Sequence, residues 1–255
     1  MNILNFQKPD KIVMQKADDF EGLFEFKPLE PGFGQTIGNS LRRVLLSSLE
    51  GYAISAVRIT GVDHEFSTIK GVVEDVVDIV LNLKQIRLKQ LVDLDDSAAE
   101  KIYLTISGKD QFVARAIEEH TNIFKIMNPG LVICNLEPSV SLELELTITK
   151  GRGYKPAEEN MPKDAPIGVI PIDAIYTPIK NVAYTISNTR VGQRTDYEKL
   201  AIEVKTDGTI HPDEAIREAS RILIQHLMLI TDENITFESE TVGETDIVDE
   251  HILHM

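Results

Sequence analysis

Apolar residues fall at helical spacing in the segment that follows Gly34. They recur three or four positions apart, as on one face of a helix over residues 36–49: Ile37, Leu41, Val44 and Leu45. Gly51 follows, where such a helix ends. Arg42 and Arg43 stand at its middle, and because neighbouring residues point about 100° apart on a helix, they face different directions. Additional leucines widen the apolar surface, which indicates packing on one side and docking on another; a core helix with a solvated arginine pair is the alternative.

Strict alternation of apolar and polar residues marks the strands, most clearly over residues 139–150. Apolar side chains there face one way and Ser, Glu and Thr side chains the other, so its sheet is expected to be antiparallel with one wet face. Shorter strands are predicted over residues 11–16, 20–27, 52–60, 86–89, 101–106, 112–117, 131–135, 182–187 and 199–205. Between them the pattern predicts a turn-rich link at 61–68, a loop at 157–166, a linking strand at 167–176 and a solvated hairpin end at 188–197.

Two more helices are predicted, over residues 72–83 and 213–230. The second opens with Pro212 and two acidic residues, which suit a helix N-terminus. Because a second apolar stripe runs beside its main one, this helix needs two partners, and another chain is the simplest second one. The main stripe includes Leu223, Leu227 and Ile230. The acidic segment 232–255 that follows has few aromatic residues and is expected to be mobile in isolation.

Composition narrows the class of function. The 255-residue chain is 42% hydrophobic, enough for one large or two modest cores. Its net charge of −15 argues against broad binding of duplex DNA, because phosphate contacts need a basic face. No apolar run approaches the ~18 residues of a membrane span, and the first residues lack a charged-then-apolar leader. Cys134 is the one cysteine and lies in an apolar run, so we expect it to be buried in a cytoplasmic protein.

Two glycine-containing segments invite comparison with phosphate-binding loops. Gly32-x-Gly34-x-x-x-Gly38 opens a helix, but no buried parallel strand precedes it and no acidic residue ends the next strand. The turn at residues 150–154, KGRGY, lacks the Gly-Lys-Ser/Thr continuation of a phosphate loop. A stand-alone phosphate- or nucleotide-binding enzyme that uses either segment is the alternative function.

The sequence shows no catalytic set of its own. Polymerase chemistry needs clustered aspartates that hold Mg²⁺, and no Asp-x-Asp-x-Asp-like run occurs. The sequence order indicates no Ser/His/Asp or Cys/His set, and no third metal ligand is placed beside His251 and His254. We therefore expect no catalytic residue, no cofactor, no metal and no small-molecule substrate for this chain.

Residues 30–48, EPGFGQTIGNSLRRVLLSS, resemble the signature helix of bacterial RNA polymerase α subunits. The resemblance continues in order along the chain with GVDHEFST at 61–68, LNLK at 81–84, KGRGY at 150–154, RVGQRTD at 190–196 and DGTIHPDEAI at 207–216. Separated motifs in a fixed order make coincidence implausible, and the resemblance covers nearly all of residues 6–230.

The resemblance implies an α+β fold with two domains. A dimerisation domain, an antiparallel sheet plus two long helices, would comprise residues 1–50 and 178–231. An inserted, mostly antiparallel α+β domain would comprise residues 51–177, and residues 232–255 would be an acidic tail at the start of a linker.

The resemblance also implies a function in transcription. The family forms a homodimer that acts as the non-catalytic assembly scaffold of DNA-directed RNA polymerase, a nucleotidyltransferase, and that recruits the β and β′ subunits. The chain would contact DNA only indirectly, through the assembled enzyme. It would be cytoplasmic and associated with the nucleoid as part of the polymerase. The expected dimer interface comprises Ile37, Leu41, Leu45, Leu223, Leu227 and Ile230. The expected β and β′ contacts comprise Arg43, Leu46, Ser47, Ser48, Lys84, Arg190 and Arg194.

Two departures from the family pattern change these expectations. His211 stands where the family usually has an acidic N-cap, which weakens the start of the last helix slightly. Family members continue through a flexible linker into a small C-terminal domain that contacts upstream DNA and activators, whereas this sequence stops at Met255. The resemblance therefore leaves promoter-element and activator binding unassigned for this sequence.

Overall fold

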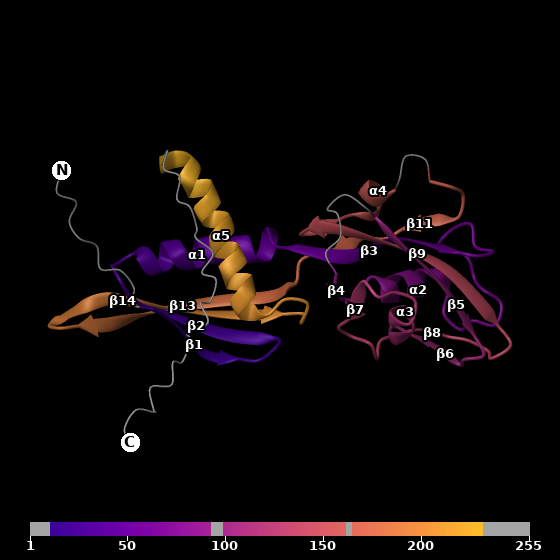
Figure 1. The fold of residues 1–255 in the computed structure, drawn as a ribbon, viewed down its shortest axis with the longest axis horizontal. Coiled ribbons are helices and arrows are strands. Elements are labelled where there is room, and N and C mark those ends of the chain that lie inside the picture. The colour runs from indigo at the N-terminus through magenta and orange to yellow at the C-terminus, as the bar shows by residue number, and fades with distance from the viewer. Residues whose placement is uncertain (1–10, 93–98, 162–164, 232–255) are drawn as a thin grey trace, which may run out of the picture.

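The computed structural model describes residues 11–92, 99–161 and 165–231. The acidic segment predicted at residues 232–255, with its two histidines, lies outside the described residues. In Figure 1 the chain forms an elongated molecule with a sheet and two long helices at one end and a second sheet with shorter helices at the other. Within the described residues no helix combines the length and the apolarity needed to cross a membrane.

The first part, here called the sheet–helix unit, is built on a four-stranded antiparallel sheet in the order β1-β2-β14-β13. Its strands are β1 (Lys11–Ala17), β2 (Glu21–Leu29), β13 (Ile179–Val191) and β14 (Arg194–Thr206). Alternation in β2 places every second side chain in the core, as a sheet with one wet face requires. Strands from the beginning of the described chain and from residues 179–206 thus meet in one sheet.

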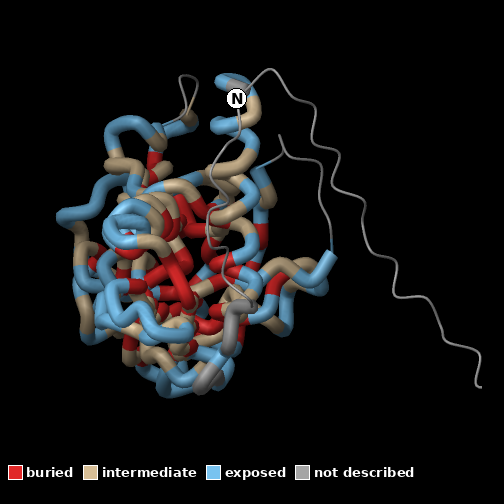
Figure 2. Tube along the Cα trace, turned by 90° about the vertical axis from the view of Figure 1, so that its left-hand side faces the viewer, coloured by how far each residue is buried: buried red, intermediate tan, exposed pale blue. Residues whose placement is uncertain are grey.

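Two long helices, α1 (Phe33–Ser47) and α5 (Pro212–Thr231), complete the sheet–helix unit on one face of that sheet (Figure 1). Figure 2 looks onto this end of the molecule and shows buried residues enclosed by exposed ones. The buried core of this unit comprises Phe24, Phe26, Leu29, Leu41, Leu45, Leu49, Ile179, Val182, Leu200, Ile202, Val204, Ala215, Ile216 and Ala219.

The second part, here called the inserted unit, lies between α1 and β13 in the chain. Its main sheet has the strand order β5-β9-β3-β4-β7, with β11 paired to β3, and every pair is antiparallel. These strands are β3 (Glu50–Ile59), β4 (Leu88–Gln90), β5 (Glu100–Ser107), β7 (Phe124–Ile126), β9 (Ser141–Arg152) and β11 (Val169–Pro171). Two small ribbons pair β6 (Gln111–Val113) with β8 (Val132–Asn135) and β10 (Tyr154–Lys155) with β12 (Ala174–Ile175).

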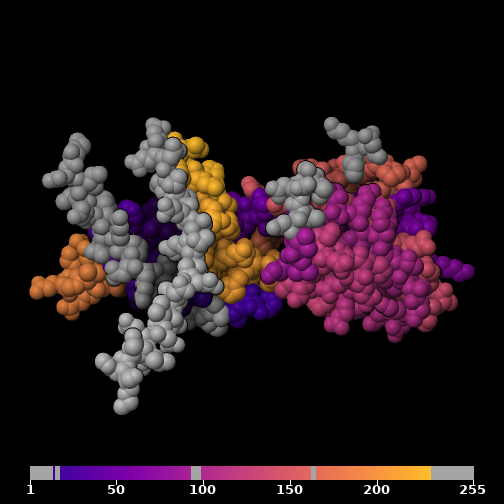
Figure 3. All heavy atoms as spheres, in the orientation of Figure 1, coloured from indigo at the N-terminus to yellow at the C-terminus, as the bar shows by residue number. Residues whose placement is uncertain are grey.

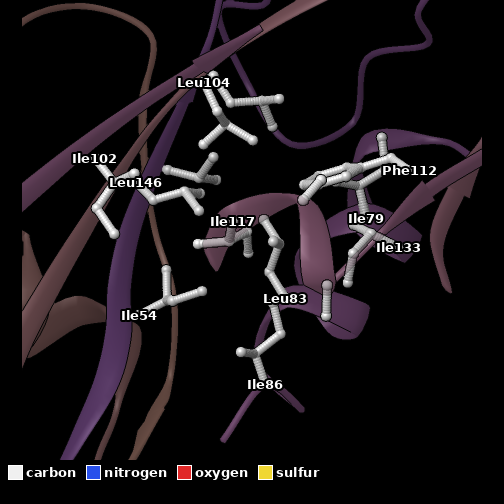
Figure 4. Close-up of a cluster of buried hydrophobic side chains, with 14 of the residues drawn as sticks. Ile54, Ile79, Leu83, Ile86, Ile102, Leu104, Phe112, Ile117, Ile133 and Leu146 are labelled. Atoms are coloured by element: carbon white, nitrogen blue, oxygen red, sulfur yellow. The ribbon is translucent and has the colours of Figure 1, made fainter. Parts of the chain in front are cut away.

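Three short helices belong to the inserted unit: α2 (Val76–Leu83), α3 (Arg115–Glu118) and α4 (Ala157–Asn160). Asp75 caps α2 by accepting a 2.8 Å hydrogen bond from the Asp78 backbone N–H. Leu83 of α2 and Ile117 of α3 are fully buried in a hydrophobic core with residues of the main sheet (Figure 4). This core is distinct from that of the sheet–helix unit, so each unit buries its own set of apolar side chains.

The fold class is confirmed: the chain is α+β with antiparallel sheets. The three long predictions, the helix after Gly34, the alternating strand and the last helix, all lie where expected, within a few residues at their ends. Periodicity over three turns or ten strand residues is therefore sufficient to place an element.

The structure corrects several shorter predictions. The predicted hairpin end at 188–197 is mostly strand, because β13 and β14 stay paired up to a tight turn in which Gly192 has a φ of 60°. The predicted strand at 112–117 divides into β6 and α3, and the predicted helix at 72–83 begins only at Val76, after the Asp75 cap. The predicted loop at 157–166 contains α4, and β7 was not predicted.

Candidate protein-binding surfaces

The start of α1 is fixed to the sheet by a carboxylate from a distant strand. Glu198 of β14 accepts hydrogen bonds from the backbone N–H groups of Gly32, at 2.9 Å, and Gly34, at 2.8 Å. The first N–H groups of a helix have no partner within the helix and carry partial positive charge, so a carboxylate there is favourable. Glu198 therefore plays the part of the N-terminal cap that Gly32 cannot supply from its own side chain.

The glycines of this segment also serve close packing of α1 on the sheet. A Cβ at Gly34 would lie 2.7 Å from Glu198 Oε2, and one at Gly38 would lie 2.9 Å from both Tyr184 Cδ2 and Leu200 Cδ1. A phosphate at this loop would have to displace a carboxylate that is already bound. The geometry thus explains the glycine spacing without a nucleotide.

In the second glycine-containing segment, KGRGY at residues 150–154, the basic side chains are already paired with a carboxylate. Glu50 accepts hydrogen bonds from the Arg152 guanidinium and lies 3.0 Å from the ammonium of Lys150. These contacts, that of Arg152 first, lower the pKa of Glu50 below its ordinary value. Gly151 allows the chain to pass the ring of Tyr176, which would lie 2.6 Å from a Cβ at that position. The KGRGY segment therefore carries a structural ion cluster at the crossing between the two units.

The two arginines at the middle of α1 have different environments. Arg42 donates from Nε to the carbonyl oxygen of Val182 at 3.2 Å, so it binds the unit's own sheet. Arg43 is exposed, and within the described residues its guanidinium has no hydrogen-bond or ion-pair partner. Ser47 and Ser48 lie one turn further along, where the Ser47 hydroxyl donates to the Arg43 carbonyl at 2.8 Å and lies 3.0 Å from that of Ser48. Leu46, directly before Ser47, is half-buried against the core.

The residues expected at a dimer interface divide into two groups. Leu41 and Leu45 are 4% and 0% exposed and belong to the core of the sheet–helix unit, which corrects their assignment: a side chain enclosed by its own chain is not available to a partner. Ile37 and Leu223 are half-buried at the edge of the same core. Exposure then rises along α5, because its last turn extends past the sheet that its first half covers (Figure 1).

The last turn of α5 presents large apolar side chains to solvent. Leu227 is 58% exposed, Leu229 is 81% exposed and Ile230 is 78% exposed. Figure 3 shows α5, in yellow, on the outer surface of the sheet–helix unit. Leu227 and Ile230 lie one turn apart on one face, and exposed apolar surface of this kind marks protein–protein interaction sites.

The remaining predicted contact residues are bound within the chain. The ammonium of Lys84 lies 2.7 Å from Asp173 Oδ2 and 5.7 Å from the centre of the Tyr154 ring. Asp173 Oδ1 also accepts from the backbone N–H of Ala157 at 2.9 Å. The Lys84 hydrogen bond, followed by that of Ala157, lowers the pKa of Asp173 below its ordinary value. Lys84 thus connects the end of α2 to β12 and the start of α4.

Arg190 and Arg194 flank the tip of the β13–β14 hairpin. Arg190 donates from Nε to the Gly192 carbonyl at 2.6 Å. Arg194 pairs with Asp196 at 2.6 Å and lies 4.6 Å from the centre of the Tyr197 ring. The Asp196 hydrogen bond raises the pKa of Arg194. Both side chains stiffen the exposed hairpin locally.

Chemical groups suited to catalysis are not gathered in the described part of the chain. Residues 11–92, 99–161 and 165–231 contain no cluster of three or more His, Cys, Asp or Glu residues that could hold a metal ion. Cys134 is buried and unpaired, as expected, and burial raises the pKa of its thiol to about 12. A thiol of this kind is a packing residue and not a nucleophile.

Sequence reasoning missed Glu198 and Asp173 as functional positions. Each is one acidic residue among many in its segment, and its partner lies 164 or 89 residues away in the chain. Gly32 and Gly34 were the one local signal of the Glu198 cap. A helix that starts without Ser, Thr, Asp or Asn at its N-cap needs a capping group from elsewhere in the chain.

Comparisons with known proteins agree with this arrangement. Residues 57–177 match the family described as RNA polymerase Rpb3/RpoA insert domain. The chain is 56% identical over 255 residues to the DNA-directed RNA polymerase subunit alpha of Cytophaga hutchinsonii, and this alignment covers 100% of the chain and 77% of that relative. The subunit alpha of Flavobacterium psychrophilum is 56% identical over 256 residues, and that of Bacteroides fragilis is 55% identical over 255 residues, each with the same coverage.

Proposed function

The chain belongs to the family of bacterial DNA-directed RNA polymerase α subunits, and we propose that within that enzyme it is the dimeric scaffold on which the two large subunits, β and β′, assemble. Its role in DNA-directed RNA polymerase follows from identities above half over the whole chain. The nucleotidyl transfer itself belongs to the assembled enzyme. This chain contributes surfaces for other proteins.

The sheet–helix unit is the dimerisation domain in this proposal, with residues 11–50 and 178–231, and the inserted unit is a second domain, with residues 51–177. Two separate hydrophobic cores support this division. The chain crosses between the units at Gly51 and again at Pro178, where the backbone leaves one core for the other.

One observation carries the dimer: the last turn of α5 exposes Leu227, Leu229 and Ile230 on a helix whose first half is buried in its own core. A second copy of the chain would cover these side chains through a self-complementary two-fold contact. Leu223, one turn before Leu227 on the same face, extends this surface, and Ile37 of α1 is half-buried against the same core. A stable interface of this type buries more than ~1,000 Å² in total.

The surface for β in this proposal is the exposed side of α1 with Arg43, Leu46, Ser47 and Ser48. The guanidinium of Arg43 has no partner among the described residues, which supports this assignment, because its planar set of donors suits bidentate binding of carboxylates or carbonyls on another chain. Lys84, Arg190 and Arg194 contribute to the surface for the large subunits through the segments that they stiffen.

Sedimentation of the chain at micromolar concentration, followed by capture of purified β, tests the proposal. We expect a dimer that captures β. A monomer would contradict the scaffold function. A nucleotide thermal shift tests the alternative enzyme, since tight nucleotide binding would stabilise the fold by mass action; we expect no shift.

A further inference from the structure

The sheet–helix unit and the inserted unit meet beside the point where the chain crosses between them. Figure 3 shows the inserted unit, in magenta, as a separate mass next to the sheet and helices. An open cleft of about 310 Å³ lies along this junction, lined by Leu88 and Gln90 of the inserted unit and by Thr209 and Ile210 of the sheet–helix unit. Because the junction contains a cleft, general packing across it is incomplete, and specific contacts have to fix the orientation of the two units.

Besides the Glu50 cluster, an ion pair between Arg87 and Asp207 joins the two units. Arg87, between α2 and β4, lies with Nε 3.7 Å from Oδ2 of Asp207, the residue that follows β14. The side chain of Asp207 is 5% exposed and that of Arg87 is 23% exposed, so the pair is largely removed from water. A buried carboxylate without a counter-charge is costly, so this pair favours the arrangement in which the two units stay together.

Both residues are held rigidly on their own units. Asp207 Oδ1 accepts from the backbone N–H of Thr209 at 3.0 Å and from its hydroxyl at 2.6 Å, and the Asp207 N–H donates to the Pro178 carbonyl at 2.9 Å. On the other side, the Arg87 N–H donates to Asn128 Oδ1 at 2.9 Å, and the Arg87 carbonyl accepts from Met127 at 2.9 Å.

Apolar contact reinforces the same place. Gly208 adopts a φ of 93°, and a Cβ there would lie 3.2 Å from Cε of Met127 in the inserted unit and 2.6 Å from the ring of Phe20. The Met127 side chain of the inserted unit thus packs against the turn that carries Asp207. Glycine at position 208 allows both the left-handed turn and this approach.

We infer that Arg87 and Asp207 form a clamp that fixes the orientation of the inserted unit relative to the sheet–helix unit. Arg87 is a positioning residue: it acts on partner binding through the placement of a whole unit. The clamp is a property of the chain by itself, and only its effect on capture of the large subunits rests on the proposed function.

The test measures the distance between the units in the full chain. Spin labels are attached at Thr105→Cys on β5 and Lys180→Cys on β13, two exposed strand positions, one in each unit. The buried thiol of Cys134 does not compete for the label. Dilution of labelled chain into an excess of unlabelled chain leaves one labelled copy per dimer. Double electron–electron resonance then reports the distribution of distances.

We expect Arg87→Gln and Asp207→Asn each to broaden this distribution, and the double variant to broaden it no further than the single ones. Arg87→Lys keeps the charge and should retain part of the narrow distribution. Arg58→Gln is the matched control, because Arg58 pairs with Glu145 inside the main sheet of the inserted unit, 4.0 Å away. An unchanged distribution in both Arg87→Gln and Asp207→Asn would overturn the clamp, whatever the outcome of the capture experiment.

Discussion

Oε2 of Glu198 lies 2.8 Å from the backbone nitrogen of Gly34, and this contact joins the first turn of α1 to the central strand β14. Through it the helix that carries Arg43 acquires a fixed position on the sheet. The orientation of a candidate binding surface thus depends on a residue that does not belong to that surface.

Removal of this cap should loosen α1. We expect Glu198→Ala to lower the free energy of unfolding by about 1–2 kcal/mol, the usual cost of a lost N-terminal cap, and Glu198→Gln to cost less because one acceptor oxygen remains. Urea unfolding at fixed protein concentration measures the change. Glu203→Ala, on the same strand with an exposed Lys205 partner 3.1 Å away, is the control and should cost under ~0.5 kcal/mol. Equal losses in the two alanine variants would contradict the capping role.

The exposed end of α5 should control self-association. Leu227→Asp places a charge where a second copy would cover an apolar side chain, and we expect a monomer or an aggregate by sedimentation. Ser107→Asp, at an exposed position on β5 of the inserted unit, is the control because it adds the same charge away from α5. The proposed interface would be misplaced if Ser107→Asp broke the dimer and Leu227→Asp did not.

Arg43 should matter for capture of β and little for stability. Arg43→Ala should leave dimer mass and thermal stability nearly unchanged while weakening β capture by ~2 kcal/mol or more, as truncation of an interface hot spot does. Arg43→Lys should rescue only part of the loss, because a point charge cannot reproduce the planar donors. A pull-down of β by each variant, with light scattering of the dimer, provides the measurement. Normal capture of β by Arg43→Ala would show that Arg43 is a solvated side chain without a role in binding β.

The Lys84–Asp173 pair should add stability at neutral pH that is lost in acid. The pKa of Asp173 is lowered in the folded chain, so the contribution is fully present above the ordinary value of 3.8 and disappears as the pH falls below it through the folded value. Lys84→Met should therefore lower stability at neutral pH and reduce the loss on acidification. Urea unfolding of both proteins between neutral and acid pH tests this. Parallel pH profiles for the two would show that the pair does not contribute.

Cys134 should resist modification while the chain is folded. Burial raises the pKa of this thiol from its ordinary value of 9.0 to about 12. Because the folded chain favours the neutral thiol, this contribution to the free energy of unfolding is fully present below pH 9.0 and is lost as the pH rises through the folded pKa of about 12. At about pH 8 a thiol reagent should react slowly with native protein and rapidly after denaturation. Rapid reaction of the native protein would mean that the core around Cys134 opens readily.

Local periodicity was enough for the elements that dominate the fold. The stripe through Ile37 and Val44, the alternation of β9 and the two-sided α5 each predicted an element, because their period is a property of consecutive residues. Ordered motifs along the sequence then indicated the family, which the comparisons confirmed. The short elements α3 and β7 escaped prediction, since three or four residues carry too little pattern.

Tertiary structure alone decided which predicted residues remain available to other proteins. Sequence spacing could not separate Arg42 from Arg43. Both are exposed, but the Val182 carbonyl on β13 binds Arg42, whereas the Arg43 guanidinium has no partner among the described residues. Leu41 and Leu227 follow the same helical pattern, yet one is enclosed by the sheet and the other extends past it. The physical reason is that burial and charge pairing depend on what packs opposite a residue. That residue is distant in the chain: Glu198 is 166 positions from Gly32, and Val182 is 140 positions from Arg42.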